Sequence, residues 1–413
     1  MISRMIFVAI ALASITACSD SNSPDPAVIV DATGPASGQE GQSIDLLAST
    51  RTSNSSNGDI AFFWQQVGGP AALIDNADSA TATIQIPLVR DATDLRFEVV
   101  ATDREGVSDK DALTITAQPA PLSQIVEIET IHDSARRIYS VYTPASVIDD
   151  TAMVVFLHGA TGNMRSFIEE GQTPRRWLEL AEQDGFVVLI PNGFSNTDGD
   201  GLGDVQTWND LRDIPFFSDA DDVGFILRAI EEVVDGRTID EDRVFVGGRS
   251  NGGQMSMRLA IEAPQVFRAV ASFVGSLPAG TDPVPFALPT PPILLYNSTE
   301  DPLVRFEATP VTRGALATVD YFSGTTWSET GSQPDYVMLE DTAADDGCEI
   351  FSKLYTGVAA QPTVSYYEGR GGGHYIPSPD RVLTPLDIAQ RGPVVCRDVH
   401  GVDLAWEFFN SVD

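Results

Sequence analysis

Basic residues are scarce in this chain of 413 residues. It has 25 Lys and Arg against 59 Asp and Glu, which gives a formal net charge of −34 at pH 7. A surface this acidic repels phosphate groups, so the composition excludes binding to nucleic acid or to an anionic membrane through charge. Hydrophobic residues make up 43% of the chain, which is globular composition, and the length allows a large core and two domains.

Long hydrophobic runs are limited to the N-terminus. Met5–Ile15 is an apolar stretch behind a positive residue and is too short to span a bilayer. It ends in Ile15-Thr16-Ala17-Cys18, which resembles the lipobox of bacterial lipoproteins. The resemblance implies that residues 1–17 are a signal peptide and that Cys18 is lipidated; a plain cleaved signal peptide is the alternative. A serine, not an aspartate, follows the cysteine, which implies an exported lipoprotein of the outer membrane or cell surface. Membrane contact is then through the lipid anchor only, and residues 18–26 form a flexible tether.

Cysteine is also rare, with three in the whole chain. If Cys18 is lipidated, Cys348 and Cys396 remain. Exported proteins meet oxidising conditions, so these two are predicted to form a disulfide; two buried free thiols are the alternative. The bridge would close a loop of about 48 residues, which is worth about 4 kcal/mol in the chain-entropy model.

Residues 27–118 have the pattern of an all-β sandwich, with short strands separated by turn residues. Trp64 is the expected core anchor. The order of Phe63-Trp64-Gln65-Gln66, Gly68-Gly69-Pro70 and Val99–Asp103 resembles the PKD/REJ-like immunoglobulin-type modules of exported bacterial proteins. The resemblance implies a spacer or a weak binder that contacts polysaccharide or polyester.

The pattern changes after a proline-containing linker at residues 119–123. From 124 to 413, apolar strands alternate with amphipathic helical segments, which predicts an α/β domain with a mostly parallel sheet flanked by helices. Val126–Glu129 and Arg137–Tyr142 are expected to form an antiparallel hairpin at one edge. The other expected strands are Met153–Leu157, Phe186–Pro191, Val244–Gly247, Ala269–Val274, Ile293–Tyr296 and Val364–Tyr367, and the expected helices are Pro174–Gln183, Asp222–Val234, Asn251–Ala263 and Val402–Phe409.

One of these strand-to-helix junctions has the sequence Gly248-Arg249-Ser250-Asn251-Gly252. A G-x-S-x-G sequence between a strand and a helix is typical of a nucleophile elbow, which holds the serine oxygen above the sheet. Ser250 is therefore the predicted nucleophile. An ordinary glycine-rich turn is the alternative.

A serine nucleophile needs a histidine base and an acid that orients the histidine. The chain has four histidines. His374 is the predicted base because three glycines precede it in a loop after a predicted strand, and His400 is the alternative. Asp301 is the predicted acid because it follows a predicted strand, where open α/β sheets place their sites. Its neighbour Glu300 is the competitor.

The negative oxygen that forms during ester cleavage needs hydrogen-bond donors. One predicted donor is the backbone N–H of Asn251. The other is expected from the loop His158-Gly159-Ala160-Thr161, with Ala160 preferred and Thr161 as the alternative.

Taken together and in their order, these motifs resemble the polyhydroxybutyrate depolymerase/feruloyl esterase group of α/β-hydrolases. The residues that carry the resemblance are His158-Gly159, Asp221-Asp222-Val223-Gly224-Phe225, Arg243-Val244-Phe245, Ser250-Asn251-Gly252-Gly253, Asp301-Pro302 and Gly372-Gly373-His374. The resemblance implies a secreted carboxylic ester hydrolase that works through an acyl-enzyme on polyhydroxyalkanoate or on feruloyl or acetyl esters of polysaccharides. No cofactor is required. Ser250, His374 and Asp301 take the catalytic roles.

The chain departs from that group at three places near the expected site: Arg249, Tyr296-Asn297 and Ile376. These departures leave the substrate open. Asp222 has a structural role in the group, which here is expected to be the capping of a helix. The alternatives to an esterase are a serine peptidase of related fold and a non-catalytic lipoprotein that binds polymers or mediates adhesion.

A second acidic motif indicates a metal site. Asn196, Asp198 and Asp200 occupy positions one, three and five of a calcium-type loop with glycine at six, and Asp204 follows. Position twelve is Thr207 and not glutamate, so a plain acidic turn is the alternative to a structural calcium site. Trp208 is expected in the core or beside the cleft.

Overall fold

The computed structural model describes residues 28–412 except 41, 53–59, 71, 88, 90–91, 120–122, 124, 148–149, 168–172, 238, 281–289, 326–335, 356–362, 380 and 382. The predicted signal peptide, Cys18 and the tether lie outside the described residues. The chain divides into two compact units, Met1–Ala120 and Pro121–Asp413. In the described part of the chain, no helix has the length and apolar character needed to cross a membrane.

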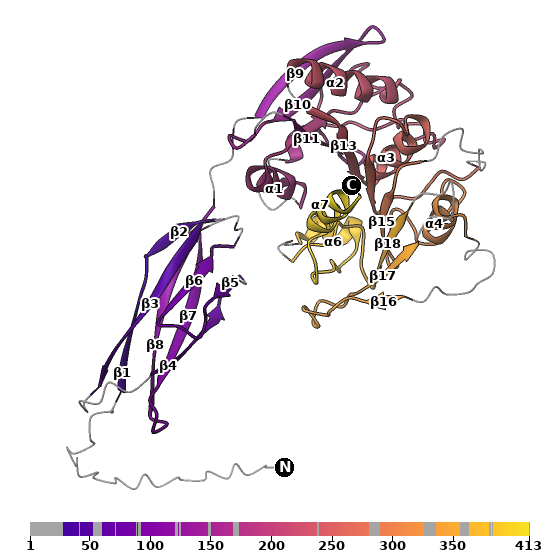
Figure 1. Cartoon of the computed structure of the whole chain (residues 1–413). Coiled ribbons are helices and arrows are strands. Elements are labelled where there is room, and N and C mark those ends of the chain that lie inside the picture. Colours follow the sequence, from indigo (N-terminus) through magenta and orange to yellow (C-terminus); the bar gives the residue numbers. More distant parts are fainter. Residues whose placement is uncertain are drawn as a thin grey trace, which may run out of the picture. The chain divides into compact units, whose positions relative to one another are not determined.

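The first unit contains two four-stranded sheets (Figure 1). Side chains of both sheets enter one hydrophobic cluster, and Trp64 lies in it with 1% of its surface exposed. The indole Nε1 donates a hydrogen bond to the carbonyl of Ser79 at 3.1 Å, which satisfies the polar atom of this core anchor. In spatial order, one sheet has β1 (Val28–Thr33), β3 (Ser43–Thr52), β6 (Thr81–Gln85) and β5 (Leu73–Asp75), and the other has β2 (Ser37–Gln39), β8 (Ser108–Gln118), β7 (Thr93–Thr102) and β4 (Ala61–Gly68).

The second unit is built on a ten-stranded mixed sheet (Figure 1). Six adjacent strands are parallel, and antiparallel strands extend the sheet at both edges. The predicted edge hairpin is confirmed, since the first two strands of this unit pair antiparallel. The spatial order is β16 (Val337–Met338), β17 (Glu349–Tyr355), β18 (Val364–Arg370), β15 (Ile293–Ser298), β14 (Ala269–Phe273), β13 (Ile239–Arg249), β11 (Thr151–Leu157), β12 (Val187–Pro191), β10 (Ala135–Tyr142) and β9 (Ile125–His132).

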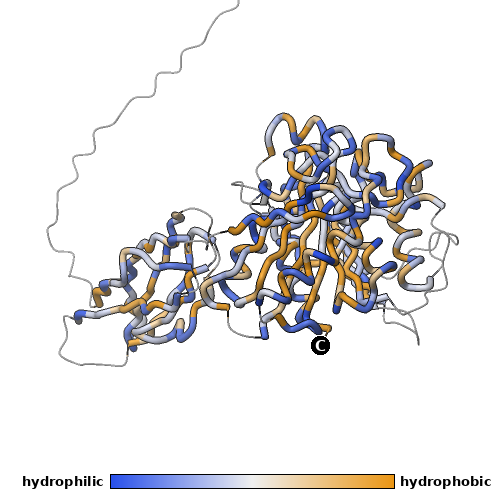
Figure 2. The backbone as a smooth tube through the Cα atoms, turned by 90° about the horizontal axis from the view of Figure 1, so that it is seen from above, coloured by the Kyte–Doolittle hydropathy of each residue, from blue (hydrophilic) through white to orange (hydrophobic). Residues whose placement is uncertain are grey.

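Helices cover both faces of this sheet. Successive side chains of a strand point to opposite faces, so a strand that is buried at every residue, such as β11, packs against helices on both sides. Met153, Val155 and Leu157 of β11 share one cluster with side chains of α2 (Asp222–Gly236), α3 (Asn251–Glu262) and α4 (Ala315–Ser323). On the other face, Phe156 packs against Trp177 of α1 (Arg176–Asp184), with ring centroids 5.8 Å apart. Trp177 in turn stacks on Phe409 of α7 (Gly401–Ser411). Figure 2 shows the hydrophobic strands in the interior of this unit.

The expected strands and helices of the second unit are all present, with ends shifted by a few residues. Among the described residues, the elements that were not expected are the short 3-10 helix η1 (Met164–Phe167), α4, β16, β17 and α6 (Pro385–Arg391). β16 and β17 lie at the edge of the sheet, where a strand needs little hydrophobic alternation to pair. α6 is a short helix without fully buried residues, so it has no apolar face to reveal it.

Candidate active site

Ser250 lies at the junction of β13 and α3, in a backbone conformation that few side-chain-bearing residues adopt. Its φ is 56° and its ψ is −124°. The neighbouring glycines are required sterically: a Cβ on Gly248 would lie 2.2 Å from the carbonyl oxygen of Gly252, and a Cβ on Gly252 would lie 2.4 Å from the oxygens of Leu157 and His158. Strain of this kind costs about 1–3 kcal/mol and is kept where the surrounding structure holds it. This is the geometry of the predicted elbow.

Asp301 and His374 are in direct contact, although 73 residues separate them in the sequence. The Nδ1 atom of His374 lies 2.7 Å from Oδ2 of Asp301, and both side chains are buried. The other carboxylate oxygen of Asp301 accepts hydrogen bonds from the backbone N–H groups of Leu303 and Val304. The carboxylate is thus fixed on one side by backbone and orients the imidazole with the other.

The three predicted residues all follow the carboxyl ends of parallel strands. Ser250 follows β13, Asp301 comes shortly after β15, and His374 comes shortly after β18. β13, β14, β15 and β18 are consecutive in the sheet, so these ends meet at one edge. The competitor Glu300 is exposed. His400 lies at the start of α7, with its Nε2 atom 3.5 Å from Ser378 Oγ.

The His374 loop is tied down by backbone hydrogen bonds and by the predicted disulfide. The backbone N–H of His374 donates to the carbonyl of Arg391, and the backbone N–H of Gly373 donates to the carbonyl of Val394. Cys348 and Cys396 are bonded to each other, with their Cα atoms 5.1 Å apart. Both sulfurs lie against Gly372, where a Cβ would be 2.7 Å from one and 3.4 Å from the other. The bridge therefore supports the backbone two residues before the imidazole.

The loop after β11 lies beside the nucleophile. A Cβ on Gly159 would be 3.4 Å from Cβ of Ser250. The amide of Thr161 is already bonded to the carbonyl of Gln206, which disfavours it as an oxyanion donor and leaves Ala160. Asn251 is the first residue of α3, and the first amides of a helix have no partner within the helix. Asn251 and Ala160 thus remain the predicted donors.

His158 is a structural residue of this loop. It is buried, its Nε2 atom accepts a hydrogen bond from the N–H of Gly193 at 3.0 Å, and Nδ1 lies 2.8 Å from the carbonyl oxygen of Gly159. Burial lowers the pKa of His158 to about 4; the bond to Gly159 opposes this shift, and the charges of Arg249 and Arg137 add to it. The neutral ring that results fits one donor and one acceptor.

A polar network behind the nucleophile was not anticipated. The side chain of Asn251 bonds the backbone of Trp208 in both directions and donates to Asp210 at 2.7 Å. Asp210 also accepts two hydrogen bonds from the guanidinium of Arg212. Trp208 is fully buried, so it belongs to the core, and its indole N–H donates to the carbonyl of His158. The network joins the start of α3 to the loop of Ala160. The only sequence signal for it was an asparagine directly after the serine.

Asp222 does not cap its helix, contrary to expectation. The cap of α2 is Asp221, whose side chain accepts the N–H of Gly224. Asp222 instead forms a buried ion pair with Arg137 at 2.6 Å and accepts the N–H of Asn209. Asp222, one position after the cap, is buried in the core, and Arg137 of β10 neutralises its charge there.

Several side-chain oxygens of the acidic loop after β12 bond to groups of the protein itself. Asn196 accepts the N–H of Asp219, Asp200 accepts the N–H of Leu202, and Asp204 pairs with Arg165 at 3.2 Å. Among the described residues, no group of three or more His, Cys, Asp or Glu is arranged to hold a metal. These contacts of Asn196, Asp200 and Asp204 fit an acidic turn better than a calcium cage, so calcium, with Asp198 as the fourth expected ligand, stays a prediction.

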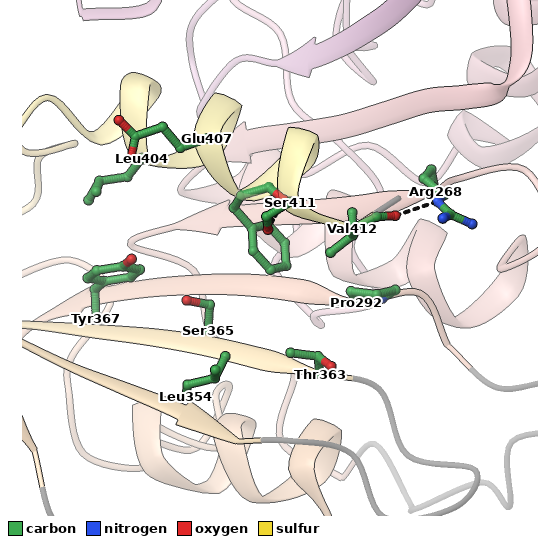
Figure 3. Close-up of a pocket in the computed structure, with 11 residues that line it drawn as sticks. Arg268, Pro292, Leu354, Thr363, Ser365, Tyr367, Leu404, Glu407, Ser411 and Val412 are labelled. Atoms are coloured by element: carbon green, nitrogen blue, oxygen red, sulfur yellow. Dashed lines mark hydrogen bonds between the residues drawn. The ribbon is translucent and has the colours of Figure 1, made fainter.

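A cavity of about 670 Å³ lies at the opposite end of the parallel strands (Figure 3). Arg268, Pro292 and Thr363, which line it, directly precede β14, β15 and β18. Asp301 and His374 follow the other ends of β15 and β18, so this cavity lies away from the candidate catalytic residues.

The strand order, the elbow and the order Ser…Asp…His along the chain define an α/β-hydrolase arrangement. In agreement with this, residues 137–308 match the family model described as Esterase PHB depolymerase. The match includes Ser250 and Asp301 and ends before His374.

Several esterases are similar to this chain. The protein named "Putative esterase NocK", from Nocardia uniformis subsp. tsuyamanensis, is 39% identical over 173 residues. These residues are 42% of this chain and 46% of NocK. Feruloyl esterase B of Neurospora crassa is 29% identical over 34% of this chain and 44% of its own length. Poly(3-hydroxybutyrate) depolymerase of Ralstonia pickettii is 28% identical over 32% of this chain and 26% of its own length. The chain thus spans about half or less of the length of these relatives.

Among solved structures, acetyl xylan esterase from Aspergillus awamori aligns with 65% of this chain and 98% of its own. The TM-score is 0.44 and the identity is 16%.

Proposed function

We propose that the protein is a serine carboxylic ester hydrolase that cleaves esters derived from polymers, either polyhydroxyalkanoate or feruloyl and acetyl esters of polysaccharides. The observation that carries the proposal is the buried hydrogen bond between His374 and Asp301 at the edge of the sheet where the strained elbow presents Ser250. A hydroxyl alone is a weak nucleophile, and an oriented imidazole is the group that activates it.

The reaction has two halves. In the first, Nε2 of His374 takes the proton of Ser250 Oγ as the oxygen attacks the ester carbonyl, while Asp301 holds Nδ1–H and stabilises the charged ring. The amides of Asn251 and Ala160 donate to the negative oxygen. The alcohol leaves with the proton from Nε2, and the acyl group stays on Ser250. In the second half, water attacks the acyl-enzyme with the same base, and the acid is released.

The substrate class is supported by the names of the similar proteins, which include feruloyl esterase, acetylxylan esterase and poly(3-hydroxybutyrate) depolymerase. All of these names describe hydrolysis of an ester, although the acid and alcohol parts differ. Water and the ester are sufficient reactants, so no organic cofactor is invoked; a bound calcium would have a structural role only.

The test is a substrate panel run on the wild type and on Ser250→Ala. The panel contains p-nitrophenyl butyrate, poly(3-hydroxybutyrate), methyl ferulate, acetylated xylan and a peptide amide. We expect at least about a 1,000-fold loss of ester turnover in the variant, because members of a catalytic triad act as a unit. Ser411→Ala, an exposed serine of α7, is the matched control and should keep full activity. A smaller loss in Ser250→Ala would mean another nucleophile, and turnover of the amide alone would make the protein a peptidase.

We further propose that the protein is exported and held at a membrane by a lipid on Cys18, and that the N-terminal unit is a PKD-like module that contacts the polymer. The lipobox-like sequence before Cys18 supports the anchor. Radiolabelled palmitate should enter the wild type, and Cys18→Ala should take up none and should leave the membrane fraction. For the module, residues 27–118 expressed alone should sediment with insoluble polymer; recovery in the supernatant would contradict the contact.

A further inference from the structure

The side chain of Arg249, directly before the nucleophile, makes no ion pair or hydrogen bond in the described part of the chain. A Cβ on Gly159 would lie 3.4 Å from Nε of Arg249, as it would from Cβ of Ser250. The guanidinium therefore lies next to the loop of the predicted oxyanion donors. The side chain is partly buried, and a cation withdrawn from water without a counterion is unfavourable. Such a group is expected to have a partner that comes from outside the chain.

The nearest charges add to this imbalance. The charges of Arg381 and Arg391 lower the pKa of Arg249, and the charge of Asp387 opposes them. Asp387 is already fully used: one oxygen accepts from Arg381 at 3.0 Å and from Arg391 at 2.8 Å, and the other accepts from the N–H and hydroxyl of Thr384. Asp387 thus already has two guanidinium partners and forms no hydrogen bond with Arg249.

Burial lowers the pKa of Arg249 to about 9, and the positive charges of Arg391 and Arg381 act in the same direction. At neutral pH the group still carries its proton. The positive charge of Arg249 therefore lies beside the serine of a chain whose formal net charge is −34. A general excess of cations does not explain this local charge.

The cationic group also borders the base. The backbone carbonyl of Arg391 accepts the backbone N–H of His374 at 2.8 Å, so the segment that carries Arg391 supports the backbone of the histidine loop. The cluster is therefore adjacent to the nucleophile on one side and to the histidine loop on the other, and a substrate ester held between Ser250 and His374 would lie next to it.

We propose that Arg249, with Arg381 and Arg391 beside it, binds a carboxylate of the substrate, so that the preferred substrates are esters that carry a second, ionised carboxyl group. A guanidinium group presents paired N–H donors that match the two oxygens of a carboxylate. The carboxylate can belong to the acyl part, as in a monoester of a dicarboxylic acid, or to the alcohol part, as at the acid end of a hydroxyacid oligomer. This inference rests on the proposed ester hydrolysis at the same serine.

The experiment compares esters that differ only in that charge. For the acyl part, the pair is mono-p-nitrophenyl glutarate and its carboxamide; for the alcohol part, it is 3-butyryloxybutanoate and its carboxamide. The measured quantity is kcat/KM for the carboxylate divided by kcat/KM for the carboxamide. In the wild type we expect a ratio above about ten for one pair, and the pair that shows it identifies the source of the carboxylate. The ratio should fall about 10- to 100-fold in Arg249→Gln, which is typical for the loss of a charged hydrogen-bond partner.

Arg243→Gln is the matched control. Arg243 lies on the same strand, six residues earlier and therefore about 20 Å away, and bonds only weakly to Asn410 at 3.5 Å in the described chain. The substitution Arg243→Gln removes the same charge as Arg249→Gln and should leave the ratio of kcat/KM values unchanged. Arg249→Lys keeps the charge and should keep an intermediate ratio. If Arg249→Gln does not fold, the wild type in 0.5 M NaCl should still show a reduced ratio, because salt screens the attraction.

Three outcomes would overturn the proposal: a wild-type ratio at or below one for both pairs, a ratio insensitive to both salt and Arg249→Gln, or an equal loss for carboxylate and carboxamide. The last outcome would mean that Arg249 supports the oxyanion and does not select the substrate. In each of these cases the proposed esterase function still stands if Ser250→Ala is inactive. If Ser250→Ala hydrolyses both substrates normally, the proposed function itself fails.

Discussion

Replacing Asp301 by asparagine should abolish most of the activity while changing the fold very little. One carboxylate oxygen accepts the N–H groups of Leu303 and Val304 at 2.8 and 2.9 Å, and the other faces Nδ1 of His374 at 2.7 Å. In Asp301→Asn, the side-chain oxygen must keep the position that faces two donors, because an NH₂ group there would leave both amides unpaired. The NH₂ group is therefore forced toward His374.

This orientation selects the wrong form of the imidazole. An NH₂ donor opposite Nδ1 requires that Nδ1 be the acceptor, so the ring proton moves to Nε2. With a proton on Nε2, His374 cannot take the proton of Ser250. We expect kcat to fall about 10,000-fold, as is typical when the orienting acid of a triad becomes an amide. At 1.36 kcal/mol per factor of ten, this corresponds to about 5.5 kcal/mol of lost transition-state stabilisation.

The assay is kcat for p-nitrophenyl butyrate at pH 7.5, together with the melting temperature of the same preparation. Glu300→Gln is the matched control: it makes the same chemical change one residue earlier, on an exposed side chain, and should stay within about threefold of the wild type. If Asp301→Asn is folded and loses less than about tenfold, the argument from the fixed amide is refuted. If Glu300→Gln is the inactive variant, the acid has been assigned to the wrong residue.

Three further outcomes follow from the described contacts. Reduction, or the pair Cys348→Ser and Cys396→Ser, should lower stability by about 4 kcal/mol in the chain-entropy model and should also reduce turnover, since both sulfurs support Gly372; an unchanged melting temperature would contradict this. The pKa of His158 is lowered to about 4 from an ordinary value of 6.5, so between these pH values the unfolded chain binds a proton at this residue and the folded chain does not. The related stability is present above pH 6.5 and is lost as the pH falls toward 4, by about 3 kcal/mol; urea unfolding at pH 7 and pH 4.5 should show a smaller difference in His158→Gln than in the wild type. EDTA should not change the melting temperature if the loop at Asp200 is an acidic turn, whereas a drop that added calcium reverses would establish the metal site.

Much of the second unit could be predicted because its strands and helices have strong local signals. β11, β13 and β14 contain short apolar runs, and α3 follows a G-x-S-x-G sequence that is typical of a nucleophile elbow between a strand and a helix. The edge elements could not be predicted so well, because β17 alternates weakly and is half exposed. α6 was missed although Thr384, Pro385 and Asp387 form a capping box with proline at its start, which is a readable signal.

The sequence by itself indicated the proposed chemistry: a serine in an elbow, few histidines from which to choose a base, and a carboxylate after a predicted strand. It also contained the two cysteines of the bridge. Only the tertiary structure decided which groups meet. It joined Asp301 to His374 across 73 residues, turned Asp222 from a helix cap into the partner of Arg137, and left Arg249 among cations beside the serine. The physical reason is that backbone patterns are local, whereas the pairing of a buried charge depends on which side chains of distant strands face the same space.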